Sequence, residues 1–99
     1  MFQSTAHFET EHGKRYATQL CRHFAHKIET EEMEEGGECR FSIGTARLRA
    51  APDRLTIEAS APTAEELVEL QSVVESHLLR FAFREGGGRL DWRRLDRVA

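Results

Sequence analysis

The sequence predicts an α+β fold: a two-layer sandwich with two helices packed on one face of an antiparallel-rich sheet. Stretches in which apolar and polar residues alternate, as in half-buried strands, precede and follow stretches with helical periodicity. Only short turns separate the predicted strands in the middle of the chain, which favours an antiparallel meander. The predicted order of elements is β-α-β-β-β-β-α-β, within a single domain that spans residues 1–99.

The first element is a strand over residues 2–10, where apolar or small side chains alternate with polar ones. The apolar or small set is Phe2, Ser4, Ala6 and Phe8. A helix follows over residues 13–28, because its apolar side chains fall within an arc of about 140° when each residue advances by 100°. These side chains belong to Tyr16, Ala17, Leu20, Cys21, Phe24 and Ile28.

The middle of the chain predicts a run of strands. The acidic stretch that reaches Glu35 ends at Gly36-Gly37, which we expect to form a hairpin turn. Further strands cover residues 39–43, 45–50 and 55–60, and Pro52-Asp53 supplies the turn chemistry before the last of them. Their inward-facing residues are Cys39, Phe41, Ile43, Ala46, Leu48, Ala50, Leu55, Ile57 and Ala59.

A second helix begins after Pro62. Thr63 is the predicted N-cap, and Glu66 stands at the position that completes a capping box. Acidic residues in this first turn also suit the positive end of the helix dipole. One face of the helix carries Leu67, Leu70, Val74, His77, Leu78, Phe81 and Ala82.

The end of this helix is open to two interpretations, because some apolar residues lie off its main face. They are Val68, Leu79 and Phe83. Either the helix ends near Arg80 and residues 81–83 are extended, or another part of the protein covers a second apolar flank. Gly86-Gly87-Gly88 is a flexible link, after which Leu90 and Trp92 alternate with charged residues in a last strand.

Composition narrows the class of protein. The formal charge of −3 and the pI near 5.9 argue against a dedicated nucleic-acid-binding protein. A mean hydropathy of −0.56 and short apolar runs exclude a membrane-spanning segment. The N-terminus lacks the pattern of a secretory signal, so we expect a cytoplasmic protein. In that reducing compartment Cys21 and Cys39 should be free thiols in the core.

Charge is unevenly distributed along the chain. Residues 29–38 hold six glutamates and no lysine or arginine, whereas residues 80–99 hold six arginines and three acidic residues. The simple interpretation is a pair of solvated faces that aid solubility. The sharper one is self-association, head to tail or as a two-fold homodimer, through complementary patches. Protonation of the five histidines would change the formal charge from −3 to +2, so association and solubility should change between about pH 5 and 7.

The sequence lacks the local motifs of several enzyme classes. No Walker sequence, G-x-S-x-G elbow or H-E-x-x-H motif occurs. Cys21 and His23 are two residues apart on a helix and do not face each other, which removes the simplest Cys-His nucleophile pair. An enzyme whose reactive group is a cysteine or a histidine is therefore the weakest alternative.

His23, His26 and His77 are the candidate metal ligands. His23 and His26 are three residues apart on one helix and could reach one ion, since imidazole binds zinc and iron. Their midpoint points about 120° away from the apolar centre of the helix, so we expect both rings to face solvent. The simple interpretation is that His23 and His26 lie on a solvent-exposed helix face and that His77 is a hydrogen-bonded residue at the boundary of the core on the other helix.

Four groups of residues resemble a family of small bacterial proteins known as a domain of unknown function. They are Arg15-Tyr16-x-x-Gln19-Leu20-Cys21-x-His23-Phe24-x-His26-Lys27, Gly44-Thr45-x-x-Leu48, His77-Leu78-x-Arg80-Phe81-Ala82-Phe83-Arg84-Glu85 and Leu90-x-Trp92. The resemblance covers nearly the whole chain, although the link at residues 86–88 is longer than is typical of the family.

The resemblance implies a cytoplasmic α+β protein in an iron-handling context, because family members often lie beside, or are fused to, siderophore-interacting flavoproteins. It also marks Arg15, Lys27 and Arg84 as candidate ligand-binding residues. We therefore expect a non-enzymatic accessory or binding protein, with a transition metal (Fe or Zn) as candidate cofactor and such a flavoprotein as candidate partner. The alternative is a self-associating module that uses Leu79, Phe83 and the charge asymmetry.

Overall fold

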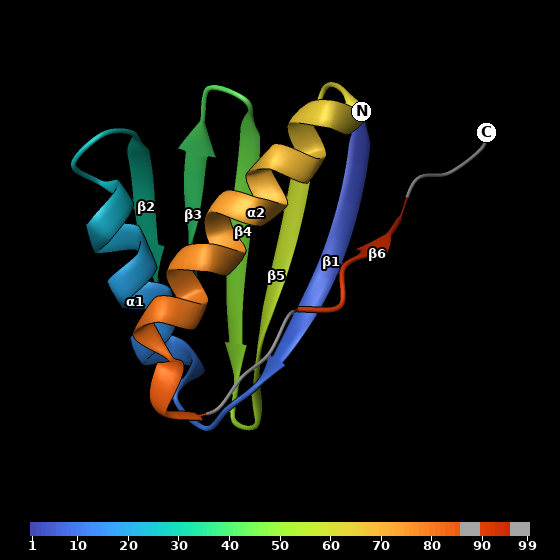
Figure 1. Cartoon of the computed structure of the whole chain (residues 1–99). Helices are drawn as coiled ribbons and strands as arrows, with labels where there is room; N and C mark the ends of the chain where they lie inside the picture. Colours follow the sequence, from blue (N-terminus) through green and yellow to red (C-terminus); the bar gives the residue numbers. More distant parts are fainter. Residues whose placement is uncertain (86–89, 96–99) are drawn as a thin grey trace.

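The computed structural model describes residues 1–85 and 90–95, which form a six-stranded antiparallel sheet, two α-helices and one short 3₁₀ helix. In chain order the elements are β1 (Phe2–Glu9), α1 (Gly13–Phe24), β2 (Glu29–Met33), β3 (Gly36–Phe41), β4 (Gly44–Ala51), β5 (Arg54–Ala61), α2 (Ala64–Phe81), the 3₁₀ helix η1 (Phe83–Glu85) and β6 (Arg93–Arg94). Both α-helices lie on the same side of the sheet (Figure 1). The predicted α+β sandwich and its order of elements are confirmed.

The strands are arranged in the order β2-β3-β4-β5-β1-β6. Strands β2 to β5 form the predicted meander. Strand β1 pairs with β5 along its whole length, from Phe2 opposite Ala61 to Glu9 opposite Arg54. Strand β6 pairs with the other side of β1. The acidic strand β2 and the arginine strand β6 therefore lie at opposite edges of the sheet.

The core lies between the sheet and the helices. The sheet contributes several small side chains, which allow the helices to approach closely: Ala6, Cys39, Ala46, Ala59 and Ala61. The sheet also contributes larger buried side chains: Phe8, Leu48, Leu55 and Ile57. The helices contribute Tyr16, Ala17, Leu20, Cys21, Phe24, Leu67, Leu70, Val74 and Leu78. In the described part of the chain, no helix is long and apolar enough to cross a membrane.

Helix α1 ends at Phe24, so the predicted boundary at residue 28 is wrong. After Phe24 the chain turns, and the N–H groups of Lys27 and Ile28 both donate to the Phe24 carbonyl, at 2.9 and 3.0 Å. The residues that follow form β2, because their backbone groups pair with β3. Sheet pairing thus limits the helix, although Ile28 still packs against the core.

The predicted hairpin turn at Gly36-Gly37 is also wrong. The turn lies at residues 34–35, and both glycines open strand β3. A side chain at Gly36 would overlap the Leu48 carbonyl, and one at Gly37 would overlap the Cys21 sulfur and lie 2.9 Å from the Glu31 carbonyl oxygen. These glycines serve close approach of the backbone to its neighbours rather than a turn.

The other strand boundaries differ slightly from prediction. Strand β3 ends at Phe41, which leaves Ile43 in the following turn, and β4 and β5 begin and end close to their predicted limits. The predicted N-cap of α2 is confirmed, since the Thr63 side chain accepts a 3.1 Å hydrogen bond from the Glu66 N–H.

Neither interpretation of residues 81–83 fully describes the end of α2. The helix runs to Phe81 and is followed by η1 rather than by extended chain. Leu79 packs against the core, while Val68 and Phe83 remain 58% and 68% exposed.

The last strand is Arg93–Arg94 rather than the predicted segment around Leu90 and Trp92. Leu90 is buried, and the Trp92 indole N–H donates to the Glu75 carboxylate at 2.8 Å. These contacts hold the segment against the core and α2, so sheet pairing begins only after Trp92. The predicted link at residues 86–88 lies outside the described residues.

Replacing Gly37 with alanine should lower the free energy of unfolding by about 1–3 kcal/mol, because the new methyl group has to displace α1 from β3. Chemical denaturation measures this change. In the Cys21→Ala background the same replacement should cost less, since the overlapping sulfur is gone. Equal costs in the two backgrounds would contradict the close packing of α1 on Gly37.

Candidate functional site

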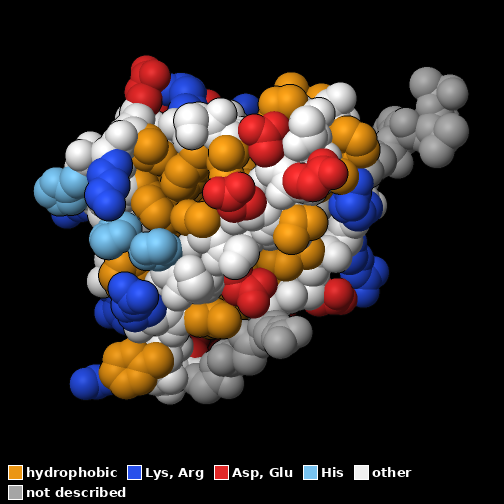
Figure 2. All heavy atoms as spheres, turned by 45° about the horizontal axis from the view of Figure 1, so that its top comes forward, with side chains coloured by type: hydrophobic (Ala, Val, Ile, Leu, Met, Phe, Trp, Pro, Cys, Tyr) orange, Lys and Arg blue, Asp and Glu red, His pale blue; other side chains and the backbone are white. Residues whose placement is uncertain are grey.

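The candidate site is a hollow between the end of α1, the middle of α2 and the end of β3, with a volume of about 450 Å³. Its apolar lining consists of Phe24, Ile28, Phe41 and Val73. Its polar lining consists of His23, His26, Lys27 and His77, and we call the whole site the histidine pocket. Figure 2 shows hydrophobic side chains gathered beside histidine and cationic side chains on this part of the surface.

Aromatic rings pack tightly in the floor and wall of the histidine pocket. The Phe24 ring centroid lies 4.9 Å from that of Phe41 and 4.9 Å from that of His77, both with edge-on geometry. The His23 ring lies 4.8 Å from the His77 ring and 5.8 Å from the Phe81 ring. Edge-on packing of this kind restricts the rings, so the wall is largely preformed.

His77 is held in one orientation by its own helix. Its Nδ1–H donates to the Val73 carbonyl at 2.7 Å, because a carbonyl oxygen only accepts. In the neutral ring this assignment leaves Nε2 with a free lone pair for a ligand or a metal. The prediction of a hydrogen-bonded boundary histidine is confirmed, since the half-buried His77 side chain lies on α2 at the edge of the core and lines the pocket.

His23 and His26 are both exposed, as predicted, yet they line the same hollow. Desolvation by neighbouring groups, followed by the charges of His77, Arg80, His26 and Lys27, lowers the pKa of His23 below its ordinary value. The cationic side chains of Lys27, in the lining, and of Arg80, close to His23, favour an anionic ligand at the opening of the pocket.

A metal centre made by the protein alone is not assembled within residues 1–85 and 90–95, because no three His, Cys, Asp or Glu side chains gather there with suitable geometry. The His23 and His77 rings lie side by side in the pocket wall, with centroids 4.8 Å apart and planes tilted by 44°. A metal ion at this position would need further ligands from a small molecule that carries it into the pocket.

The candidate ligand-binding residues divide between two places. Lys27 lines the histidine pocket, whereas Arg15 and Arg84 do not. The Arg15 guanidinium lies 5.6 Å from the centre of the Tyr16 ring, and that of Arg84 lies 5.7 Å from the centre of the Phe83 ring. Both arginines are thus placed near the start of α1 and the end of α2 rather than at the pocket.

A separate hydrogen-bonded cluster joins these regions. The Tyr16 hydroxyl donates to the Glu85 carboxylate, which also accepts from the Thr10 hydroxyl at 3.0 Å. Burial, and then the hydrogen bond to Glu85, raise the pKa of Tyr16; that hydrogen bond also lowers the pKa of Glu85. The cluster fastens η1 to the loop before α1, which gives the motif residue Glu85 a structural role.

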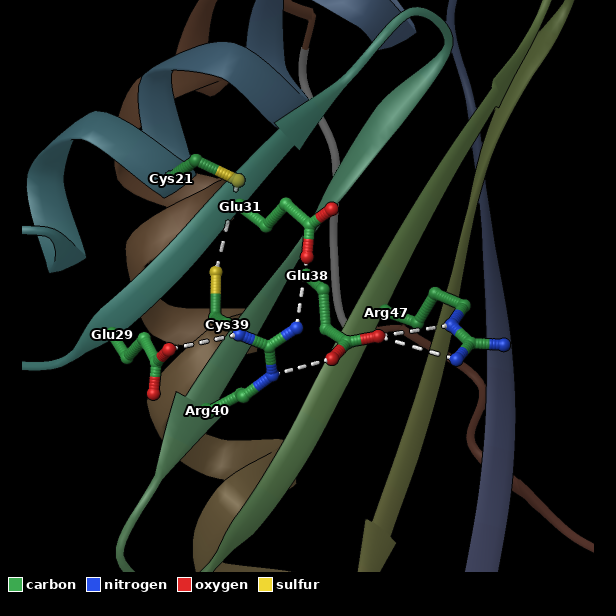
Figure 3. Close-up of polar contacts among 7 residues, drawn as sticks. All are labelled: Cys21, Glu29, Glu31, Glu38, Cys39, Arg40 and Arg47. Carbon is green, nitrogen blue, oxygen red and sulfur yellow. Dashed lines mark hydrogen bonds and ion pairs between the residues drawn. The ribbon is translucent and has the colours of Figure 1, made fainter.

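A charged network covers part of the open side of the sheet (Figure 3). Arg40 contacts Glu29, Glu31 and Glu38 at 3.4, 2.9 and 2.7 Å, and Arg47 contacts Glu38 at 3.2 Å. Burial opposes ionisation of Glu38, but hydrogen bonds from Arg47 and Arg40 outweigh it and lower its pKa. These charges compensate one another, so the network explains how a polar side of the sheet remains stable without helices over it.

The sequence motifs did not identify several residues of the histidine pocket and of the charged network. Phe41 and Val73 line the pocket but carry only a core-like signal in the sequence. Glu38 was one of many glutamates in an acidic stretch, yet its side chain is only 12% exposed. Its position opposite Arg47 in the sheet register would have been the useful signal.

Replacing Glu38 with glutamine should lower the free energy of unfolding at neutral pH by about 1–3 kcal/mol, because two arginines lose a shared, mostly buried carboxylate. The lowered pKa of Glu38 stabilises the folded state above the ordinary value of 4.5, and this contribution is lost as the pH falls through the lowered pKa. The wild type and variant should therefore converge in acid.

Denaturation at a series of pH values tests this expectation. Glu58→Gln is the matched control, because Glu58 pairs with Arg49 from a more exposed position and should cost less than about 1 kcal/mol. A loss for Glu38→Gln that stays constant from neutral to acid pH would contradict the assignment.

The chain is similar to a solved structure and matches a known protein family. An NMR structure of PA4090 from Pseudomonas aeruginosa is 35% identical over 94% of this chain and 96% of its own, with a TM-score of 0.80. No functionally curated protein matches the chain. Residues 5–93 match the family described as "Uncharacterized protein conserved in bacteria (DUF2218)". This chain therefore belongs to the DUF2218 family of uncharacterised bacterial proteins, as its motifs predicted.

Proposed function

We propose that this protein is a non-enzymatic binding protein that holds a small, flat, anionic molecule in the histidine pocket. The observation that carries the proposal is the 450 Å³ hollow with aromatic rings in its wall and Lys27 and the imidazoles at its opening. Aromatic walls favour planar ligands, and cationic groups at the opening favour a carboxylate or phenolate. The lining consists of four apolar side chains, three imidazoles and one lysine, a composition that suits the holding of a ligand.

The iron context of the family resemblance narrows the class of ligand. A catecholate chelate of ferric iron is planar in its aromatic parts and anionic, so it suits both the wall and the opening of the pocket. The lone pair on His77 Nε2 could take an open coordination position of such a metal, with His23 beside it. A siderophore-interacting flavoprotein is the partner that this proposal expects.

Calorimetric and NMR titrations with 2,3-dihydroxybenzoate, its ferric complex and Zn²⁺ alone test the proposal. The ferric complex should bind most tightly, because it uses both the cationic opening and the imidazoles. Lys27→Gln should weaken both aromatic probes about tenfold, a loss of about 1.4 kcal/mol. His77→Phe retains a ring but no nitrogen, so it should weaken only the ferric complex, while Zn²⁺ alone should bind weakly to wild type and variant because the described residues supply too few ligands.

Lys14→Gln is the matched control, because Lys14 is also an exposed lysine near α1 but lies outside the histidine pocket. It should leave all affinities unchanged. If neither aromatic probe shifts the amide signals of Phe24, Phe41 and Val73 at millimolar concentration, the proposed ligand class is wrong. Equal weakening by Lys14→Gln would place the interaction elsewhere.

A second candidate function is self-association, and the arrangement of the sheet edges favours it. The acidic strand β2 lies at one edge, and Arg93 and Arg94 of β6 lie at the other. Copies of the chain could therefore meet head to tail through opposite charges. The exposed ring of Phe83 adds an apolar contact point on the helix side.

Light scattering over a range of protein concentrations tests this second candidate. At low ionic strength the average mass should rise with concentration, and high salt should restore the monomer because it screens charged surfaces. Reversing the charge of the β6 edge with Arg93→Glu should abolish the rise. A monomer mass that is independent of concentration at low salt would exclude self-association.

A further inference from the structure

Two thiols far apart in the sequence meet in the core, on two elements that also carry residues of the histidine pocket. Cys21 of α1 and Cys39 of β3 are 0% and 1% exposed, and their sulfur atoms lie 3.9 Å apart. Figure 3 shows the Cys21 side chain pointing from the helix toward that of Cys39 on the strand. Both thiols are free, so the structure contains a reduced dithiol in its core.

We propose that this dithiol is an oxidation site at which a small hydroperoxide joins Cys21 to Cys39 in a disulfide and so changes the shape of the histidine pocket. The sulfur atoms are 3.9 Å apart, so a disulfide bond of about 2.0 Å requires rotation of the two side chains together with a shift of α1 relative to β3. Because the thiols are buried, a compact oxidant is the chemical class that fits.

The surroundings of the sulfur atoms shift their pKa values in opposite directions. The two thiols lie within hydrogen-bond distance of each other, and this interaction, followed by burial, raises the pKa of Cys39. The same interaction lowers the pKa of Cys21 against the opposing effect of burial. In the steps below Cys21 is written as the attacking thiolate and Cys39 as the resolving thiol, and the same disulfide forms if the two exchange roles.

The reaction balances as two steps. The Cys21 thiolate attacks one oxygen of the hydroperoxide, the O–O bond breaks, and the other oxygen leaves as an alcohol (water when the oxidant is hydrogen peroxide) after it takes up the proton released by Cys21. The sulfur of Cys39 then attacks the Cys21 sulfenic acid, the S–O bond breaks, and the hydroxyl leaves as water with the Cys39 proton. Two thiols lose two electrons, which reduce the hydroperoxide.

The position of the dithiol links it to the pocket. Cys21 lies one helical turn before Phe24, and Cys39 lies two residues before Phe41 on the same side of β3. The rings of Phe24 and Phe41 touch in the pocket wall. Closing the disulfide moves the elements that carry these rings, because the Cys21 sulfur already lies against Gly37. The consequence for ligand binding rests on the proposed function, whereas the disulfide itself does not.

The test treats the folded, reduced protein with hydrogen peroxide in the absence of any ligand. Thiol titration after denaturation should fall from both thiols to none, and intact mass should show a monomer that has lost two hydrogens. Peptide mapping should find Cys21 joined to Cys39, and dithiothreitol should reverse the change. The matched variant Cys39→Ser should lose its remaining thiol to sulfenic or sulfinic acid without an internal disulfide.

The other outcomes overturn the proposal. Retention of both thiols, an intermolecular disulfide, or oxidation of Cys21 with Cys39 still free would each exclude the internal disulfide, and these wild-type results stand even if Cys39→Ser does not fold. NMR signals of Phe24, Phe41 and His77 should differ between the oxidised and reduced forms. Unchanged signals in a protein that does form the disulfide would exclude the link to the pocket, and neither result depends on whether a ligand is found.

Discussion

The close approach of α1 to β3 is the contact on which the rest of the structure depends. Gly37 has no side chain, which allows the Cys21 sulfur to occupy the space above β3. The approach brings Cys21 to Cys39 and, one helical turn later, Phe24 to Phe41. Since backbone and sulfur fill this space, even one added methyl group has to move an element. The histidine pocket and the dithiol are both consequences of this packing.

The side of the sheet that no helix covers is stabilised by charged side chains. Both helices cover the opposite side, so the open side has to be stable in contact with water (Figure 1). Arg40, Arg47 and Glu38 occupy neighbouring register positions and compensate one another's charge. The acidic edge strand β2 has a further effect, since charged edges discourage uncontrolled pairing with other sheets. An edge of opposite charge, such as β6 of a second copy, would be attracted to β2 instead, and the proposed self-association depends on this attraction.

Part of the candidate site was predictable because its residues lie in one short segment. His23, His26 and Lys27 follow one another on or just after α1, and the helical period places the histidines on the solvent side. The proximity of His77 was not predictable, because it lies on the other α-helix and its distance from His23 depends on how the helices cross the sheet. Arg15 and Arg84 share the motifs but lie away from the pocket, so a motif did not identify a single site.

The sequence by itself determined the alternation of strands and helices, the cap of α2 at Thr63 and the apolar faces, because these depend on residues within a few positions of one another. Tertiary structure decided where α1 ends, why Gly36 and Gly37 lie in a strand, and where the last strand begins. In each case backbone pairing or a distant side chain outweighed local preference. The meeting of Cys21 with Cys39 has the same origin: register and helix packing set distances between elements, and neither is encoded in a local pattern.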